Sequence, residues 1–268
     1  MSSLGYLPIT LVILAFATFI ATYIIAVVRG DVSAAFPYIS DTGAEIPESC
    51  IFGQFLNLTA CLAFCTMYIR YKSIQSIAGD EDVWLRRMNK ISFIMGIISA
   101  IGVSMVANFQ ERTEVEPVHF TGAALTFILG LLYTFVQTGI SYHMYPDYSG
   151  IYICRVRLAV CLTSLASFII IYLAAAAAGY AVYEWNRHTH DESKFKWKPD
   201  DPGYAAHVVS TAGEWMTAIT FMCYFFTYVR EFFKFELNIA MRPLVRHLDE
   251  EPYYYDRESS DERTRLLA

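Results

Sequence analysis

YAAHVVSTAGEWMTAITFMCYFFTYVR, residues Tyr204–Arg230, is the stretch that decides how this chain folds. It is apolar for long enough to cross a bilayer, yet it contains a carboxylate, Glu214, about ten residues from its start. At about 1.5 Å of helical rise per residue, that position is roughly 15 Å deep, about half of a hydrocarbon core. A charged side chain there costs about 2.5–3.5 kcal/mol on insertion scales. We therefore expect other polar groups of the fold to compensate for Glu214.

The composition of the whole chain is typical of a multi-span membrane protein. Of its 268 residues, 55% are hydrophobic and only 17% are charged. The apolar residues form long blocks and the charged residues lie between the blocks, whereas a soluble protein distributes charges over every surface helix. A formal net charge of −6 gives no indication of nucleic-acid binding.

Six apolar runs are each close to or above the roughly 17–25 residues that span a bilayer. They cover residues 7–28, 51–69, 91–107, 118–140, 156–182 and 205–229. No Lys or Arg precedes the first run, so we interpret it as an uncleaved span and not as a signal peptide. The sequence predicts an all-α membrane protein with a six-helix transmembrane domain over residues 1–230. A cytosolic, largely disordered tail is expected over residues 231–268.

The distribution of Lys and Arg between the runs predicts the orientation. Fourteen of these residues lie in the tail and in the connections after the second and fourth runs, and six lie in the other connections. Because cytoplasmic loops carry the excess of Lys and Arg, both termini are expected in the cytosol. The connection over residues 29–50 is then lumenal, and its PYISDTG string (Pro37–Gly43) is expected to form an ordered cap.

Polar residues recur at helical spacing within several of the runs. His207 and Glu214 are seven residues apart in the sixth run, so they lie on the same side of a helix. Polar side chains in lipid must face the bundle interior, each other or water. The predicted topology gathers eight residues toward the lumenal half, beneath the PYISDTG loop. They are Glu214, His207, His119, Asn57, Gln54, Asn108, Gln110 and Asp41.

Several interpretations of this polar cluster stay open. Polar residues between membrane helices often only hold the helices together, at about 0.6 kcal/mol per hydrogen bond. Gly122 and Gly130 similarly indicate close helix contacts. The cluster could instead hold a lipid headgroup or an ion, which Glu214 favours because an acid is an expensive way to join helices. Membrane Glu and His pairs also form proton relays, although the runs show no clear internal repeat of a transporter.

The sequence contains no motif of an enzyme or a metal site. No HxxxH or HExxH pair places metal ligands on one helix, no CxxC pair occurs, and no GxSxG string indicates a serine hydrolase. Four of the six cysteines lie within apolar runs, where reduced packing residues are expected. We therefore expect no metal, no cofactor and no enzymatic activity.

The chain ends in a candidate sorting signal. Glu262-Arg-Thr-Arg-Leu266-Leu267 fits the acidic dileucine form, acid-x-x-x-Leu-Leu, which cytosolic adaptor complexes read when they direct membrane proteins to endosomes and lysosomes. The pattern is short, but it lies at the end of a segment whose low hydrophobicity indicates disorder. We expect Glu262, Leu266 and Leu267 to bind adaptor complexes, with an unread acidic tail as the alternative.

Five strings of the chain resemble the damage-regulated autophagy modulator (DRAM) family, part of the wider Frag/DRAM/Sfk group of six-span proteins. They are PYISDTG at Pro37–Gly43, PESCIFG at Pro47–Gly53, VANFQ at Val106–Gln110, HFTGAALTF at His119–Phe127 and GEW at Gly213–Trp215. The ERTRLL end is similar to that of the family's second paralogue. Gly213 stands where the family pattern would have Ala, and both residues are small.

The resemblance implies a multi-pass protein of the lysosomal or late endosomal membrane that promotes autophagy and is linked to cell-death control. Its implied partners are membrane lipids, cytosolic adaptor complexes and the autophagy machinery. The resemblance supplies no catalytic residues. A lipid-remodelling enzyme, or a lipid or proton-coupled transporter that uses the polar cluster, is the alternative.

Overall fold

The computed structural model describes residues 3–79, 81–110, 114–189 and 197–238, with the backbone alone for residues 183–189. The chain divides into two compact units, Met1–Phe235 and Glu236–Ala268. Every secondary-structure element of the described residues is helical, which confirms the all-α prediction. The candidate sorting signal at Glu262, Leu266 and Leu267 lies outside the described residues.

The first unit contains eight α-helices within the described ranges. They are α1 (Tyr6–Arg29), α2 (Glu48–Ile77), α3 (Val83–Asn108), α4 (Glu116–Ala124), α5 (Gly130–His143), α6 (Ile151–Thr189), α7 (Tyr204–Phe226) and α8 (Val229–Phe232). A π-helical segment, η3 (Leu125–Leu129), joins α4 and α5 into one continuous helix. Two short 3-10 helices, η1 (Ser3–Gly5) and η2 (Asp41–Gly43), complete the unit.

Five helices of the described chain are long and apolar enough to cross a membrane. They are Ser3–Arg29, Glu48–Ile77, Val83–Asn108, Glu116–His143 and Ile151–Val182, and they contain the first five predicted runs. The helix over the sixth run, α7, is not among them. Its buried face is largely polar, whereas exposed positions such as Val209, Met216 and Phe226 are apolar. The polar inner face therefore lowers the hydropathy of a helix whose outer face is apolar.

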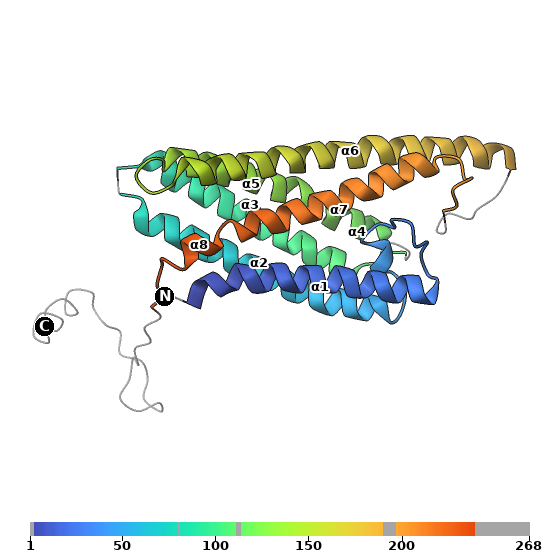
Figure 1. Ribbon diagram of the computed structural model, residues 1–268, viewed down its shortest axis with the longest axis horizontal. Helices are drawn as coiled ribbons and strands as arrows, with labels where there is room; N and C mark the ends of the chain where they lie inside the picture. Colours follow the sequence, from blue (N-terminus) through green and yellow to red (C-terminus); the bar gives the residue numbers. More distant parts are fainter. Residues whose placement is uncertain (1–2, 80, 111–113, 190–196, 239–268) are drawn as a thin grey trace, which may run out of the picture. The chain divides into compact units, whose positions relative to one another are not determined.

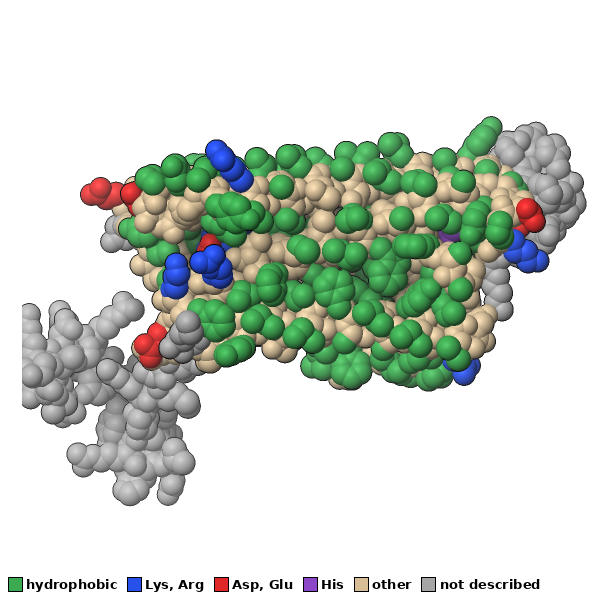
Figure 2. Space-filling view, in the orientation of Figure 1, with side chains coloured by type: hydrophobic (Ala, Val, Ile, Leu, Met, Phe, Trp, Pro, Cys, Tyr) green, Lys and Arg blue, Asp and Glu red, His purple; other side chains and the backbone are tan. Residues whose placement is uncertain are grey.

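The helices of this unit form a closed ring. Each packs against its neighbour in the chain, in the order α1, α2, α3, the continuous α4–η3–α5 helix, α6 and α7, and α7 returns to pack against α1. Figure 1 shows α7 between α6 and α1. On the face shown in Figure 2, hydrophobic side chains cover the middle of the helices and charged side chains gather at their two ends. This distribution fits helices whose central parts lie in lipid.

Glycines allow close helix contacts in the ring. A Cβ added to Gly102 of α3 would lie 2.6 Å from the carbonyl oxygen of Gly122 in α4. A Cβ on Gly130 would lie 3.1 Å from the Phe221 ring of α7. Both distances are too short for a larger residue without displacement of the neighbour. These contacts confirm that Gly122 and Gly130 serve close packing.

Two of the arginines that were counted as loop charges are buried within helices. The second apolar run ends at residue 69, but α2 continues to Ile77. Arg157 is the second residue of the fifth run and was counted with the preceding connection, but α6 begins at Ile151. Arg70 is therefore helical and 1% exposed, and Arg157 is helical and 0% exposed. The limits of an apolar run thus differ from the limits of the helix that contains it.

Candidate functional site

The loop between α1 and α2 contacts the middle of α7 at Glu214. The Glu214 side chain is half-buried, and its Oε2 accepts a hydrogen bond of 2.7 Å from the backbone N–H of Ile39. Hydrogen bonds to charged groups contribute about 1.5–3 kcal/mol. That range is comparable to the insertion cost of about 2.5–3.5 kcal/mol for a membrane carboxylate. The Ile39 N–H is thus a polar partner of the kind that the sequence led us to expect.

Two further hydrogen bonds fix the same loop on α7. The Tyr38 hydroxyl donates to Oγ of Ser210 at 2.7 Å, and the indole Nε1–H of Trp215 donates to the carbonyl oxygen of Pro37 at 2.9 Å. The Trp215 ring also packs edge-to-face against Phe19 of α1, with 6.3 Å between ring centroids. The PYISDTG loop therefore contacts α7 through consecutive residues.

His207 lies under this loop in an aromatic environment. Its side chain is 4% exposed, and its ring stacks on Trp197 with 4.3 Å between centroids and 10° between planes. Tyr38 contacts the same ring edge-on at 5.2 Å. His207 is two helical turns from Glu214, so these contacts make it a packing residue of the loop and α7.

An apolar cavity of about 130 Å³ lies inside the ring, and Glu214 and His119 both line it. The other polar groups in its wall include Ser40, Thr126 and Tyr133, and the rest of the lining is mostly aliphatic and aromatic. An engineered apolar cavity of about 150 Å³ binds benzene, so this volume fits a short piece of hydrocarbon. The cavity is too small for a whole lipid.

The His119 ring is buried at the start of α4. It is 4% exposed, and its Nδ1 lies 2.7 Å from the carbonyl oxygen of Phe109. A carbonyl oxygen can only accept, so Nδ1 carries the proton in this contact. The hydrogen bond orients the ring at the cavity wall.

Asn57 and Asn108 form a polar group of their own between α2 and α3. Nδ2 of Asn57 donates to Oδ1 of Asn108 at 2.9 Å, and Oγ of Ser104 donates to Oδ1 of Asn57 at 2.6 Å. Asn108 is exposed and Asn57 is half-buried, so this pair faces the outside of the ring more than its interior. It joins α2 to α3, as interhelical hydrogen bonds commonly do.

The remaining residues of the predicted cluster occupy different positions. Gln54 is exposed on α2. Nε2 of Gln110 donates a long hydrogen bond of 3.5 Å to the carbonyl oxygen of Ala107. Asp41 is half-buried at the start of η2. Of the eight predicted residues, Glu214 and His119 share the cavity wall and His207 shares the loop contact with α7.

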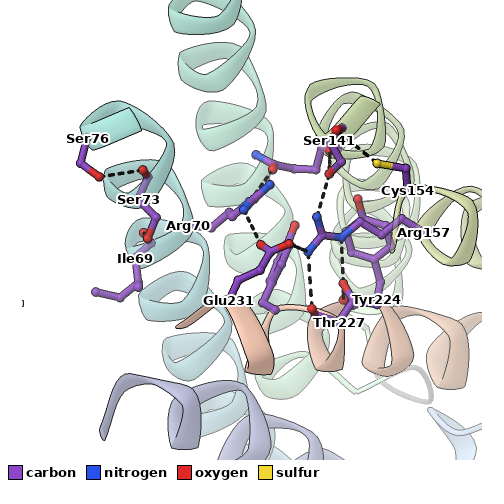
Figure 3. Close-up of polar contacts among 12 residues, drawn as sticks. Ile69, Arg70, Ser73, Ser76, Ser141, Cys154, Arg157, Tyr224, Thr227 and Glu231 are labelled. Atoms are coloured by element: carbon purple, nitrogen blue, oxygen red, sulfur yellow. Dashed lines mark hydrogen bonds and ion pairs between the residues drawn. The ribbon is translucent and has the colours of Figure 1, made fainter. Parts of the chain in front are cut away.

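A second polar group lies at the opposite end of the helices, next to α8, and the sequence interpretation missed it. Glu231 of α8 lies between two buried arginines, Arg70 of α2 and Arg157 of α6 (Figure 3). Its Oε2 is 2.6 Å from Nη1 of Arg70, and its Oε1 is 2.9 Å from Nη2 of Arg157. The sequence signal that could have indicated this group is an arginine at the edge of each of two apolar runs. We call these three residues the arginine–glutamate site.

Neutral side chains hold the two guanidinium groups in place. Nε of Arg70 donates to Gln137 at 3.1 Å. Arg157 donates through Nε to Oγ1 of Thr227 at 3.0 Å and through Nη1 to Oγ of Ser141 at 2.7 Å. Arginine's planar set of donors suits such a multiply bonded, buried position.

The net electrostatic effect at the arginine–glutamate site favours the charged carboxylate. Burial raises the pKa of Glu231, but Arg70 and then Arg157 lower it by more, and the pKa lies below its usual value. Glu231 is therefore ionised at neutral pH.

No group of three or more His, Cys, Asp or Glu residues in the described part of the chain could hold a metal ion.

Comparisons with known proteins agree with the architecture. The Frag1/DRAM/Sfk1/Cwh43P N-terminal domain family matches residues 3–235. The chain is 39% identical to human DNA damage-regulated autophagy modulator protein 2, over 99% of this chain and 96% of that protein. It is 35% identical to human DNA damage-regulated autophagy modulator protein 1, over 88% of this chain and 94% of that protein. Modulator of macroautophagy TMEM150B-A from Xenopus laevis is 36% identical over 67% of this chain and 77% of its own length. No solved structure matches the chain.

Proposed function

The chain belongs to the DRAM family within the Frag1/DRAM/Sfk1/Cwh43P group, and on that premise we propose that it modulates autophagy from the lysosomal or late endosomal membrane. The observation that carries the proposal is similarity along nearly the whole length to proteins named as autophagy modulators. In this proposal the protein acts without enzymatic chemistry, through membrane lipids and protein partners, and influences cell death through autophagy.

The direct test measures autophagic flux in cells that lack the protein. Flux is read as the accumulation of lipidated autophagosome marker when lysosomal degradation is blocked. Re-expression of the wild-type chain should restore flux. Equal flux with and without the chain would contradict the proposed role.

The topology proposed for this function has six spans and both termini in the cytosol. Its support is that α7 completes the ring and has apolar residues on its exposed side. With α7 as a sixth span, tags at the two ends of the chain lie on the same side of the membrane. Protease added to intact vesicles should remove both tags together. A five-span chain would leave one of the two tags protected.

The proposed route to the lysosome is the acidic dileucine signal. Replacement of Leu266 and Leu267 by Ala should move the protein from lysosomes to the cell surface, because adaptor complexes recognise the leucine pair. Replacement of Arg263 and Arg265 by Ala is the matched control, since it changes the intervening residues and leaves Glu262 and the leucines in place. Lysosomal residence of the leucine variant would contradict the sorting proposal.

A second candidate function is the binding or movement of lipid or protons, which the cavity favours. The cavity is mostly apolar, and Glu214 and His119 are part of its wall. Ala218→Leu places bulk in the cavity wall, and Ala212→Leu adds the same bulk at an exposed position of α7. Loss of autophagic flux in Ala218→Leu, with normal flux in Ala212→Leu, supports a cavity that holds a ligand.

Glu214→Gln tests the charge in the same cavity, because it keeps the shape of the side chain. Expression, location and flux equal to wild type would leave the acid without an electrostatic role, and the transport alternative would lose its support. Reduced flux at normal expression and location would favour that alternative.

A further inference from the structure

The arginine–glutamate site contains more positive than negative charge. Two guanidinium groups share one carboxylate, and these contacts are the ion pairs of Arg70 and Arg157 within the described residues. Arg70 is 1% exposed and Arg157 is 0% exposed, so water screens neither charge effectively. A buried charge normally needs full pairing. Within the described part of the chain, one positive charge at this site is therefore without a counter-charge.

The site also contains an unused hydrogen-bond donor. Nη2 of Arg70 is buried and has no hydrogen-bond partner among the residues that the structure describes. The other guanidinium nitrogens of Arg70 bind Gln137 and Glu231. Because buried polar atoms are almost always paired, an unpaired guanidinium donor indicates a missing acceptor. The carboxylate of Glu231 has two oxygens, and both already contact the arginines.

The two arginines are positioned independently of Glu231. Both guanidinium groups lie over the ring of Tyr228, with 5.1 Å from Cζ of Arg70 and 4.8 Å from Cζ of Arg157 to the ring centroid. Arg70 also donates a hydrogen bond to Gln137, and Arg157 donates one to Ser141. Two fixed, adjacent guanidinium groups match the geometry with which proteins bind phosphate oxygens.

We propose that Arg70 and Arg157 form a binding site for a phosphate monoester, and that Glu231 occupies this site as an internal ligand that the phosphate displaces. A phosphate monoester carries about −1.5 to −2 charges and three acceptor oxygens. It would therefore balance both arginines and supply an acceptor for Nη2 of Arg70. The carboxylate provides one charge and two oxygens.

The position of the site favours a lipid headgroup as the source of the phosphate. Arg70 lies in the last third of α2, directly after the second apolar run, and Arg157 lies near the start of α6, at the beginning of the fifth run. The Glu231 side chain is 22% exposed, so it forms the outer side of the site. Lys234, which is exposed, adds a further positive charge that acts on Glu231. An anionic headgroup in the adjacent leaflet would be attracted to Lys234 and to the two arginines behind Glu231.

Displacement of Glu231 would loosen α8, which is a single helical turn. Apart from Glu231, α8 is held by its buried residues Val229 and Phe232, and the Phe232 ring stacks on Tyr228 at 5.8 Å. The next residue, Phe233, packs edge-on against Tyr6 of α1 at 5.4 Å. Phosphate binding at this site would therefore change the packing of α8 and of Phe233, shortly before residues 236–268 begin.

The test uses the full-length chain in phosphatidylcholine nanodiscs, in which both leaflets are accessible. Hydrogen exchange of residues 227–235 is compared in four samples: phosphatidylcholine alone, with phosphatidylinositol 4-phosphate, with phosphatidylserine at equal charge, and with added inorganic phosphate. We expect faster exchange with the monoester lipid and no change with phosphatidylserine. Faster exchange with inorganic phosphate alone would support the site but assign it to free phosphate. No change in any sample, or an equal change with phosphatidylserine, would overturn the proposal.

Variants separate the site from general attraction to a basic surface. Glu231→Gln removes the carboxylate that competes with phosphate for the two arginines. The form of the protein in which the arginines are open to phosphate is then no longer a minor one, so affinity for the monoester lipid should rise about tenfold or more. Arg157→Gln should abolish binding. Arg155→Gln removes the same charge from an exposed position of the same helix and should leave binding unchanged.

Glu231→Gln and Arg155→Gln decide the question if Arg157→Gln does not fold. An unchanged affinity of Glu231→Gln for the monoester lipid, or a large loss of binding in Arg155→Gln, would contradict a phosphate site at these arginines.

Discussion

The backbone N–H of Ile39 and the carboxylate of Glu214 are joined by a hydrogen bond of 2.7 Å across 175 residues of sequence. It attaches the loop after the first helix to α7, which closes the ring against α1. Glu214, in the middle of an apolar run, thus binds a backbone N–H of the loop between α1 and α2. The loop and α7 should therefore lose stability together when this contact is removed.

Glu214→Ala removes the acceptor for the Ile39 N–H. We expect a loss of about 1–3 kcal/mol in the free energy of unfolding, because the backbone N–H of the buried Ile39 loses this acceptor. Thermal unfolding of the purified protein in detergent measures it. Glu214→Gln should lose less, since the amide oxygen can accept the same hydrogen bond. Glu114→Ala, at an exposed position, is the control and should have no effect. Equal midpoints for the Glu214 and Glu114 variants would contradict the prediction.

Trp215→Phe tests the second contact of the loop. The phenyl ring can keep the packing against Phe19 but cannot donate to the carbonyl oxygen of Pro37. A loss of about 0.5–1.5 kcal/mol is expected in the same unfolding measurement. Trp84→Phe changes a 46% exposed ring and serves as the control. A larger effect at Trp84 than at Trp215 would count against the loop contact.

Gly102→Ala tests the close approach of α3 and α4. The new Cβ would lie 2.6 Å from the carbonyl oxygen of Gly122, so the helices must separate, and a loss of about 1–3 kcal/mol is expected. Gly139→Ala is a matched control on α5, where a Cβ meets nothing within 4 Å. It should be neutral or stabilise by about 0.4–1 kcal/mol, because Ala restricts the unfolded chain. Similar unfolding midpoints for the two variants would exclude a tight α3–α4 contact.

Asp82 predicts a dependence of stability on acidic pH. Its Oδ1 accepts from the N–H of Leu85 at 2.9 Å, and its Oδ2 lies 2.8 Å from Nε2 of His143. The Leu85 N–H, followed by His143, lowers the pKa of Asp82 in the folded protein. A lowered folded-state pKa gives stability that is fully present above the unfolded-state pKa of about 3.9. That stability is lost as the pH falls through the folded-state pKa.

Unfolding of wild type and Asp82→Asn at a series of pH values checks this effect. The contribution of Asp82 should be constant from neutral pH to about pH 5 and should decrease below about pH 4. The Asn side chain keeps an oxygen for the Leu85 N–H but has no titratable group. The difference between the two proteins should therefore shrink in acid. A difference that grows in acid would contradict the assignment.

Much of the fold could be predicted because hydropathy is a local property. The first five apolar runs lie within helices that are long and apolar enough to cross a membrane. The expectation that PYISDTG forms an ordered cap next to Glu214 agrees with the contacts of Tyr38 and Ile39. The sequence placed this loop over a cluster of polar side chains from the helices, and the contact with Glu214 comes from the backbone of the loop itself.

The arginine–glutamate site could not be predicted by the same reasoning. Arg70 and Arg157 stand at the edges of apolar runs, where sequence rules treat arginines as loop charges that determine orientation. Arg70 is helical because α2 continues beyond its run, and Arg157 is the second residue of its run in a helix that begins at Ile151. Their burial depends on how these helices pack against α8. The predicted group of eight residues likewise separates in space, with Gln54 exposed and Asn57 paired to Asn108.

The sequence by itself determined the membrane class, the all-helical fold, the family and the need for a partner of Glu214. These follow from composition, apolar run length and local strings, which do not depend on how the helices pack. Only the tertiary structure decided that Ile39 meets Glu214 and that Glu231 meets Arg70, across 175 and 161 residues. The physical reason is that such contacts depend on how each helix is rotated and where the ring closes, and helical periodicity alone specifies neither.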